Sequence, residues 1–151
     1  MGLTAGLLDK TVFLDTAPLI YFIEGHSIYQ DPLFELFKAN DEGKLRFATS
    51  TLTLLEVLVQ PMRLNRSDLV DKYEQILTSS PHLDIYDIDF RIARRAAQLR
   101  AKYNLKTPDA LQIATCVERK SDVFLTNDVD LKKVTEVAVL TLKEIIDKGP
   151  L

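Results

Sequence analysis

The chain has 151 residues, the size of one domain, and is long enough to enclose a single large hydrophobic core. Its 46% apolar and 27% charged residues exclude a disordered or fibrous chain and are typical of a globular protein. The net charge of −3 excludes the overall basic character of many nucleic-acid-binding domains. Any attraction for nucleic acid must therefore come from a local basic patch or from a bound metal ion.

The sequence carries no membrane or export signal that we can identify. Its longest apolar stretches, 12–23 and 52–62, are each interrupted by an acid and are too short to span a bilayer. The N-terminus lacks the positively charged start of a secretory leader. The single cysteine, Cys116, cannot form an internal disulfide, and its place on the apolar side of a helix predicts a buried, inert thiol. We therefore expect a cytoplasmic protein.

The predicted elements alternate between strands and helices in one domain, 11–151, preceded by an N-terminal extension, 1–10. In chain order they are strand 12–14, helix 16–23, helix 32–43, strand 45–48, helix 51–61, a helix starting at 67, strand 84–88, helix 90–103, a helix starting at 107, strand 123–125, strand 137–140 and helix 142–147. Strands separated by helices predict a three-layer α/β fold, with a mainly parallel five-stranded sheet flanked by helices.

Local signals set several of the helix ends. Gly25 closes the first helix, and Ser50 and Thr51 cap the helix that Pro61 is expected to break. Thr107 is predicted as an N-cap with Pro108 at the first helical position, which puts Asp109 in the first turn.

Four acids stand in positions that a shared site would explain. Asp15 and Asp128 each follow an apolar strand, and ligands of parallel sheets gather at that carboxyl edge. Asp109 lies at a helix start, where it could simply complement the helix dipole. Glu56 is the only ionisable side chain of its apolar helix, although it could reach solvent or pair with a distant arginine.

Convergence of these four acids would require a cation. At about 5 Å each pair of carboxylates repels by roughly 3 kcal/mol at an effective dielectric of 20, and a dipole or cap does not offset six such pairs. An oxygen-only cluster suits Mg²⁺ or Mn²⁺. Zinc is poorly supported, because His26 and His82 lie far apart in sequence, in loops.

Four segments carry a resemblance to a known family: VFLDTAPLIYFIEG, TSTLTLLEVLVQP, TPDALQIATC and VFLTNDVDL. Over about 11–146 the chain resembles a PIN domain, specifically the small stand-alone ribonucleases of the VapC toxin type. The resemblance implies that the metal-binding acids are Asp15, Glu56, Asp109 and Asp128, with Asp130 as a further acid, and it leaves open which of Asp128 and Asp130 is closer to the metal. It also implies supporting polar roles for Thr16, Thr107, Thr126 and Asn127.

The function implied by the resemblance is metal-dependent hydrolysis of RNA phosphodiester bonds, leaving a 5′-phosphate and a 3′-hydroxyl, by the toxin of a type II toxin–antitoxin pair. A homodimer and a cognate antitoxin are implied on the same ground. In the mechanism that we expect, Asp15 and Asp109, with Asp128 directly or through water, hold Mg²⁺. Glu56 either accepts a proton from the attacking water or binds a second ion.

Arginines on the helix 90–103 offer a local attraction for RNA. Arg94 and Arg95 point outward in the predicted helix, just before the helix of Asp109, and could guide an RNA backbone into the site. The alternative is an ordinary solvated charged face.

Two other functions remain compatible with the sequence. The first is a catalytically silent PIN-like RNA-binding or scaffold module, which a missing acid would favour, whereas all four acids are present. The second is another Mg-dependent α/β phosphotransfer enzyme. Aspartyl-phosphate phosphatases of that kind have two aspartates at the end of the first strand, where this chain has Asp15, Thr16 and Ala17.

Overall fold

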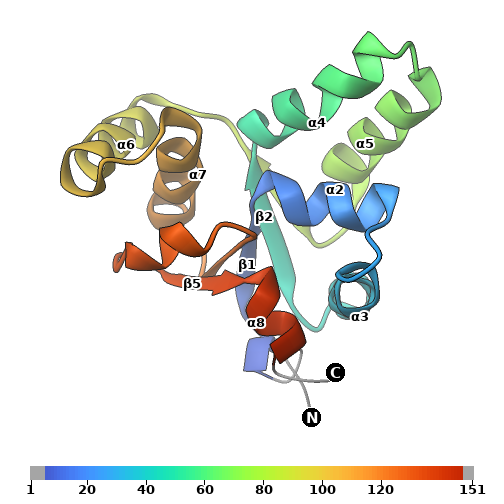
Figure 1. Ribbon diagram of the computed structural model, residues 1–151, viewed down its shortest axis with the longest axis horizontal. Helices are drawn as coiled ribbons and strands as arrows, with labels where there is room; N and C mark the ends of the chain where they lie inside the picture. Colours follow the sequence, from blue (N-terminus) through green and yellow to red (C-terminus); the bar gives the residue numbers. More distant parts are fainter. Residues whose placement is uncertain (1–5, 148–151) are drawn as a thin grey trace.

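The computed structural model describes residues 6–147, whose strands form a single five-stranded parallel sheet (Figure 1). The strand order is β3-β2-β1-β4-β5, and every neighbouring pair is parallel. The strands are β1 (Thr11–Leu14), β2 (Arg46–Ser50), β3 (Leu83–Tyr86), β4 (Val123–Thr126) and β5 (Ala138–Thr141). This confirms the predicted three-layer α/β fold with a five-stranded sheet.

Helices cover both faces of the sheet. They are α2 (Thr16–Glu24), α3 (Gln30–Asp41), α4 (Thr51–Arg63), α5 (Ser67–Ser79), α6 (Phe90–Tyr103), α7 (Thr107–Glu118), the short 3₁₀ helix η1 (Val129–Lys133) and α8 (Leu142–Asp147). Helices α6 and α7 pack on one face, and α2 to α5 pack on the other (Figure 1). None of the described helices is both long and apolar enough to cross a membrane.

Strand alternation divides the interior into two cores. Val12 and Leu14 of β1 face α2 to α5, whereas Phe13 between them faces α6 and α7. Phe13 stacks on Phe124 of β4, with ring centroids 5.6 Å apart. Because successive side chains point to opposite faces, a strand that is apolar throughout, such as β1, can be buried on both sides. This explains why β1 lies at the centre of the sheet.

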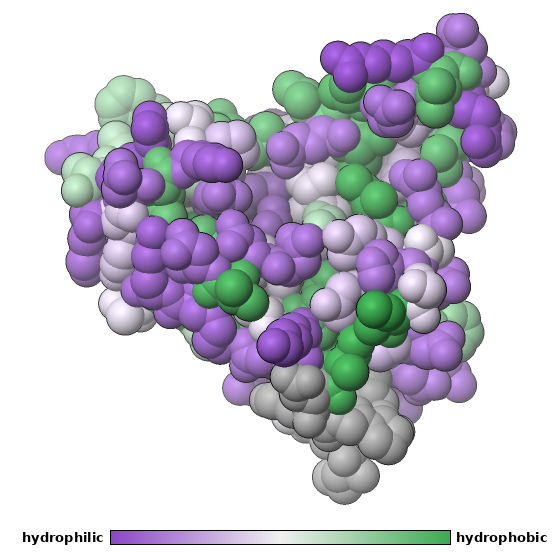
Figure 2. Space-filling model, in the orientation of Figure 1, coloured by the Kyte–Doolittle hydropathy of each residue, from purple (hydrophilic) through white to green (hydrophobic). Residues whose placement is uncertain are grey.

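The direction of strand addition reverses between β1 and β4. From β1 the chain adds β2 and then β3 on one side, and it then returns to place β4 and β5 on the other. At such a switch point the loops that leave the two central strands diverge and open a site at the carboxyl edge. In Figure 1 this edge faces the space between the α6–α7 pair and the α4–α5 hairpin, and the surface is indented there in Figure 2.

Several predicted boundaries are wrong by one or two residues. Pro61 does not break α4, which continues to Arg63 although Pro61, buried in the last turn, cannot donate a helical hydrogen bond. Thr107 is the first helical residue and not the N-cap, which is Lys106. The third strand ends at Tyr86 and not at residue 88, and α3 begins two residues before Pro32.

The predicted N-terminal extension packs partly against the domain. Residues 1–5 lie outside the described residues, but Leu7 is 5% exposed and belongs to the core beside α2 to α5. The Asp9 backbone N–H donates to the Lys44 carbonyl at 2.9 Å. Cys116 is buried as expected, and burial raises the pKa of its thiol.

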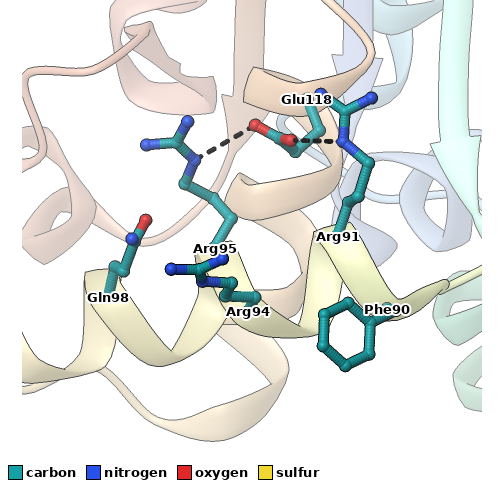
Figure 3. Close-up of a pocket in the computed structure, with 6 residues that line it drawn as sticks. All are labelled: Phe90, Arg91, Arg94, Arg95, Gln98 and Glu118. Carbon is teal, nitrogen blue, oxygen red and sulfur yellow. Dashed lines mark hydrogen bonds and ion pairs between the residues drawn. The ribbon is translucent and has the colours of Figure 1, made fainter.

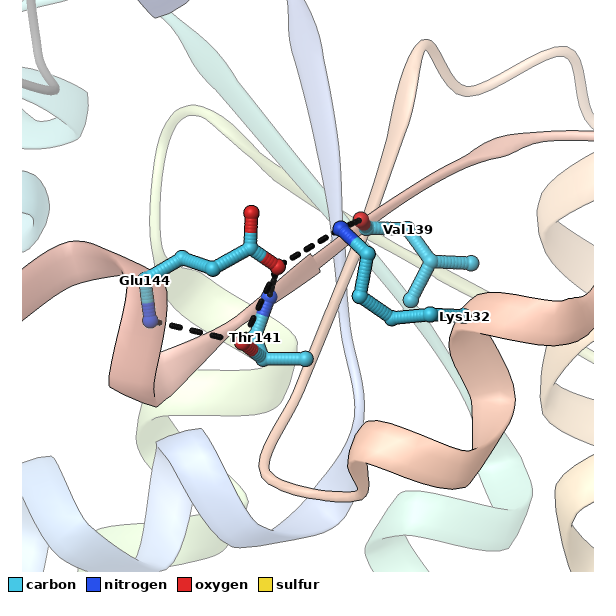
Figure 4. A network of polar contacts seen from close by, with 4 residues as sticks. All are labelled: Lys132, Val139, Thr141 and Glu144. Carbon is cyan, nitrogen blue, oxygen red and sulfur yellow. Dashed lines mark hydrogen bonds and ion pairs between the residues drawn. The ribbon is translucent and has the colours of Figure 1, made fainter. Parts of the chain in front are cut away.

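A network of hydrogen bonds beside the edge strand β5 holds η1 in place (Figure 4). Lys132 of η1 donates to Glu144 of α8 at 2.6 Å and to the Val139 carbonyl at 2.9 Å. Glu144 also accepts from the Thr141 hydroxyl at 3.0 Å. Partial burial acts to raise the pKa of Glu144, but these hydrogen bonds outweigh it and hold the pKa below its usual value. The segment that follows β4 is thereby tied to β5 and α8.

Candidate active site

Asp15 is the central acid at the carboxyl edge of the sheet. It follows β1 directly and is the N-cap of α2, where one carboxylate oxygen accepts from the Thr16 backbone N–H at 2.8 Å. The other oxygen accepts from the Thr126 hydroxyl, also at 2.8 Å. Because Thr126 ends β4, this bond joins the two strands that flank the switch point. Asp15 is therefore held in a fixed orientation at the predicted place.

Burial and neighbouring negative charges disfavour ionisation of the Asp15 carboxyl group. Burial is the largest cause, and the carboxylates of Asp109 and Glu56 add to it, so that the pKa of Asp15 rises to about 6. The hydrogen bonds from Thr126 and Thr16 act in the opposite direction but do not cancel the rise. The carboxylates of Asp109 and Glu56 are thus close enough to Asp15 to interact with it electrostatically, although they lie on other helices.

Glu56 projects from α4 toward the first turn of α2. Its Oε1 accepts a hydrogen bond from the Thr16 hydroxyl at 2.6 Å. The alternative of a remote arginine partner does not apply, since Glu56 is bound to the residue that follows Asp15. The apolar helix α4 therefore delivers its one carboxylate to the same edge as β1.

Asp109 lies half-buried in the first turn of α7, as predicted. Burial is the main cause that raises its pKa above the ordinary value, and Asp128, Glu56 and Asp130 raise it further. Lys106 lowers it but does not outweigh the acids. Asp109 thus interacts electrostatically with acids from both sides of the switch point.

Asp128 and Asp130 follow β4 in different arrangements. Asp128 caps η1 by accepting from the Asp130 backbone N–H at 3.0 Å, and its own N–H donates to the Thr126 hydroxyl at 3.2 Å. Asp130 pairs with Lys133 at 3.0 Å. Thr126 therefore links Asp15 with the backbone of Asp128, whereas the Asp130 carboxylate is engaged by a cation.

The acids meet at one edge without forming a closed cage. Within residues 6–147, no three acidic, histidine or cysteine side chains stand close enough to hold a metal ion between them. The donors that could serve are all oxygens, which suit Mg²⁺ or Mn²⁺. Burial is the largest cause of the raised pKa values of Asp15 and Asp109, and the neighbouring carboxylates add to it. The donor atoms therefore suit a hard divalent ion in their chemistry, although not in their spacing within residues 6–147.

A buried polar network behind the acids was missed by sequence reasoning. Gln112 of α7 is 1% exposed and donates to the Thr53 hydroxyl at 2.7 Å and, more weakly, to the Thr16 hydroxyl at 3.5 Å. Its oxygen accepts from the Ser50 hydroxyl at 2.6 Å. Gln112 thus connects β2, α4 and α7 to the threonine that holds Glu56. The available signal was a lone amide on an otherwise apolar helix face, one turn after Asp109.

The remaining predicted residues lie in varied places. Thr126 supports Asp15 directly, but Asn127 is exposed and donates to the Tyr21 hydroxyl at 3.1 Å, and Thr107 is exposed at the start of α7. Arg94 and Arg95 project from α6, where Arg95 pairs with Glu118 at 3.1 Å. Glu118 is in the last turn of α7, so these arginines do not border Asp109.

These features define a three-layer α/β domain with acids at the switch point of a parallel sheet. Residues 12–137 match the sequence model of the PIN domain, and the chain belongs to the PIN domain family. No curated protein matches the whole sequence significantly.

Solved structures with the same fold include several toxin–antitoxin proteins. DNA-bound VapBC from Salmonella typhimurium aligns with a TM-score of 0.72 and 19% identity, over 88% of this chain and 98% of that one. VapBC2 from Rickettsia felis, bound to a promoter DNA fragment, gives 0.71 and 15% over 87% and 98%. Mycobacterium tuberculosis VapC20, a sarcin–ricin loop cleaving toxin, gives 0.66 and 15% over 84% and 98%. At these identities the comparison establishes the fold.

Proposed function

We propose that this PIN domain protein is a metal-dependent endoribonuclease and the toxin of a type II toxin–antitoxin pair. The observation that carries the proposal is Asp15, buried at the switch point, with a pKa raised by burial and by the charges of Asp109 and Glu56. Such a carboxylate is costly to keep ionised unless a cation binds beside it. Membership in the PIN family and the fold shared with VapBC proteins support the nuclease and toxin assignments.

In this mechanism Asp15, Asp109 and Asp128 would hold Mg²⁺ or Mn²⁺, which would supply activation of a water molecule and compensation of the charge on the phosphoryl oxygens. Thr126 orients Asp15 and steadies the backbone of Asp128, which supports Asp128 over Asp130 as the ligand.

Glu56 acts as the proton acceptor in our proposal. The Thr16 hydroxyl occupies one of its oxygens and leaves the other available to accept a proton from the attacking water. Binding of a second ion by Glu56 remains the alternative that we stated from the sequence. Glu56→Gln keeps the size of the side chain and should reduce kcat by about 10²- to 10⁴-fold if Glu56 is the base.

We also propose a cytoplasmic antitoxin as partner and self-association into a homodimer. A hollow of about 310 Å³ between α3 and α5 is lined by apolar side chains that include Phe22, Phe34, Phe37 and Ile76. Phe34 is 56% exposed at its rim. An amphipathic segment of an antitoxin would bury these rings, as helices do in apolar grooves. The VapBC complexes with the same fold support a partner of this kind.

The test of the proposed activity is cleavage of labelled RNA by the purified protein. We expect cleavage with Mg²⁺ or Mn²⁺, none with chelator, and activity at the chelator level for Asp109→Asn. Asp71→Asn, which removes an exposed acid on α5 away from the sheet edge, is the matched control and should keep full activity.

Each alternative has its own outcome in this assay. Equal cleavage by the wild type, the chelated protein and Asp109→Asn would indicate a contaminant and contradict the proposal. RNA binding without cleavage in either metal would favour the silent PIN-like module. Phosphorylation of Asp15 by a small phosphodonor would favour a phosphotransfer enzyme.

A further inference from the structure

A basic surface hollow lies on α6, away from the acidic edge. It has a volume of about 220 Å³ and is lined by Phe90, Arg91, Arg94, Arg95, Gln98 and Glu118. Figure 3 shows the three guanidinium groups and the Phe90 ring along one side of α6, with Glu118 reaching in from α7. We call these six residues the basic hollow. It brings three cations and one carboxylate together in a chain of net charge −3.

Glu118 fixes two of the three arginines. It is only 14% exposed, and its two oxygens lie 3.5 Å from Arg91 Nε and 3.1 Å from Arg95 Nε. One carboxylate therefore serves two guanidinium groups and leaves an excess of positive charge at the hollow. The remaining N–H groups of these guanidinium groups point away from Glu118 and stay available as donors (Figure 3).

Arg94 is the cation of the hollow that is left for a ligand. Within residues 6–147, no acidic side chain lies within ion-pair distance of its guanidinium. It is exposed, one turn after Phe90 on the same helix, so the two side chains are neighbours on one face. In Figure 3 the Arg94 guanidinium extends along α6 toward Gln98, so the aromatic ring and the free cation are displayed one helical turn apart on the helix.

Phe90 is the most exposed of the large apolar side chains in residues 6–147, with 82% of its surface accessible. It occupies the first position of α6, where a polar residue would serve the helix equally well. An aromatic ring left in solvent beside guanidinium groups is the combination with which proteins bind single-stranded nucleic acid. The ring stacks on a base, and the cations bind the phosphates.

We propose that the basic hollow is a second RNA-binding site, which holds single-stranded RNA outside the catalytic edge. Arg94 and the free N–H groups of Arg91 bind phosphates, and one base stacks on Phe90. The inference rests on the proposed ribonuclease function and adds to it a subsite for RNA that flanks the cleaved bond. Single-stranded RNA fits better than an acidic protein segment, because an acidic segment would use the arginines and leave Phe90 unexplained.

The distance from the catalytic edge sets the length of RNA that can use both sites. Glu118 comes nine residues after Asp109 on the same helix, which places it roughly 14 Å further along at 1.5 Å per residue. Stacked nucleotides advance about 3.4 Å each along a strand, so the span corresponds to about four stacked nucleotides and to fewer where the strand is extended. A substrate that ends at the cleaved bond cannot reach the basic hollow.

The direct test measures binding of a labelled 12-nucleotide single-stranded RNA to the protein carrying Asp109→Asn, which blocks cleavage. In this background Arg94→Glu and Phe90→Ala should each raise Kd at least about fivefold. Arg94→Glu should also reduce the slope of log Kd against log salt by about 0.7. Lys72→Glu on α5 makes the same charge change at an exposed position on the other side of the sheet and should leave both values unchanged.

A cleavage assay with the catalytically intact protein separates this site from the catalytic one. Arg94→Glu and Phe90→Ala should raise KM for the 12-nucleotide RNA and leave kcat unchanged, and they should not affect a substrate too short to reach the basic hollow. Thermal unfolding checks that the variants fold, as is expected for exposed side chains.

The results that would overturn the inference are distinct from those that would overturn the proposed function. Unchanged RNA affinity in Arg94→Glu and Phe90→Ala contradicts the basic hollow as an RNA site, even if the wild type cleaves RNA. If these substitutions weakened the binding of an acidic peptide but not the binding of RNA, the hollow would be assigned to a protein partner. A wild type that binds RNA through the hollow without cleaving it would contradict the nuclease and leave this inference standing.

Discussion

At the scale of single residues, the charge state of Asp15 links the site to stability. Burial raises the pKa of Asp15 from 3.8 to about 6, so the folded protein holds this proton more tightly than the unfolded chain does. The stabilisation from the protonated form is complete below about pH 4 and is lost as the pH rises through 6. At 1.36 kcal/mol per pKa unit, the loss is at most about 3 kcal/mol.

We therefore predict that Asp15→Asn stabilises the metal-free protein at pH 7.5. Asparagine is also a good N-cap and carries no charge, so the free energy of unfolding in chelator should rise by about 1 to 3 kcal/mol. The difference between variant and wild type should shrink as the pH falls from 7 to 4. Denaturant unfolding at several pH values measures this. A variant less stable than the wild type at pH 7.5 would contradict the account.

The sequence was sufficient to identify the acids but not the groups that hold them. Asp15, Asp109 and Asp128 follow strands or begin a helix, and those positions can be recognised locally. Gln112 could not be assigned in the same way, because its hydrogen bonds to Ser50, Thr53 and Thr16 depend on how three separate elements pack. Hydrogen bonds between distant segments are set by tertiary structure, which a local pattern does not encode.

At the scale of elements, α4 carries an apolar stripe that the domain does not cover. Leu55, Val59 and Met62 recur at helical spacing, with exposed fractions of 59%, 39% and 56%. Apolar surface, in green, lies over the α4–α5 hairpin in Figure 2. A second copy of the chain that packs the same stripe against this one would cover it, in keeping with the homodimer that we propose.

We predict that Met62→Lys prevents self-association, because it places a charge within an apolar contact. Light scattering should give the wild type twice the 17.1 kDa mass of one chain and the variant the mass of a monomer. Ile28→Lys, which makes the same change at an exposed apolar residue outside α4, should stay dimeric. A monomeric wild type at tens of micromolar would show that the stripe does not mediate dimers.

The elements themselves were largely predictable, and their ends were less so. Helices 90–103 and 142–147 match the prediction, since hydrophobic periodicity is strong there. Pro61 was misinterpreted because the local preference of proline against helix was overridden by tertiary packing, since Pro61 is buried within α4. The short helix η1 escaped notice because Val129 to Lys133 has no apolar period and is held by Lys132 and Glu144.

At the scale of the whole molecule, the topology creates the site. Asp15 and Asp128 are 113 positions apart in the sequence, and the order β3-β2-β1-β4-β5 brings the elements of the four acids to one edge. Burial, with a smaller contribution from the neighbouring acids, raises the pKa values of Asp15 and Asp109, so keeping both ionised costs stability. A divalent ion that binds there must stabilise the fold in proportion to its concentration over Kd.

The most direct test of the account is therefore the binding of Mn²⁺ itself, measured by calorimetry or by the loss of the electron paramagnetic resonance signal of free Mn²⁺. We predict saturable binding by the wild type, its loss in Asp15→Asn and in Asp109→Asn, and its retention in the control Asp71→Asn. Mn²⁺ should also raise the melting temperature of the wild type and of the control Asp71→Asn, but not that of Asp15→Asn or Asp109→Asn. Binding that persists undiminished in both Asp15→Asn and Asp109→Asn would contradict a metal site at the carboxyl edge of the sheet.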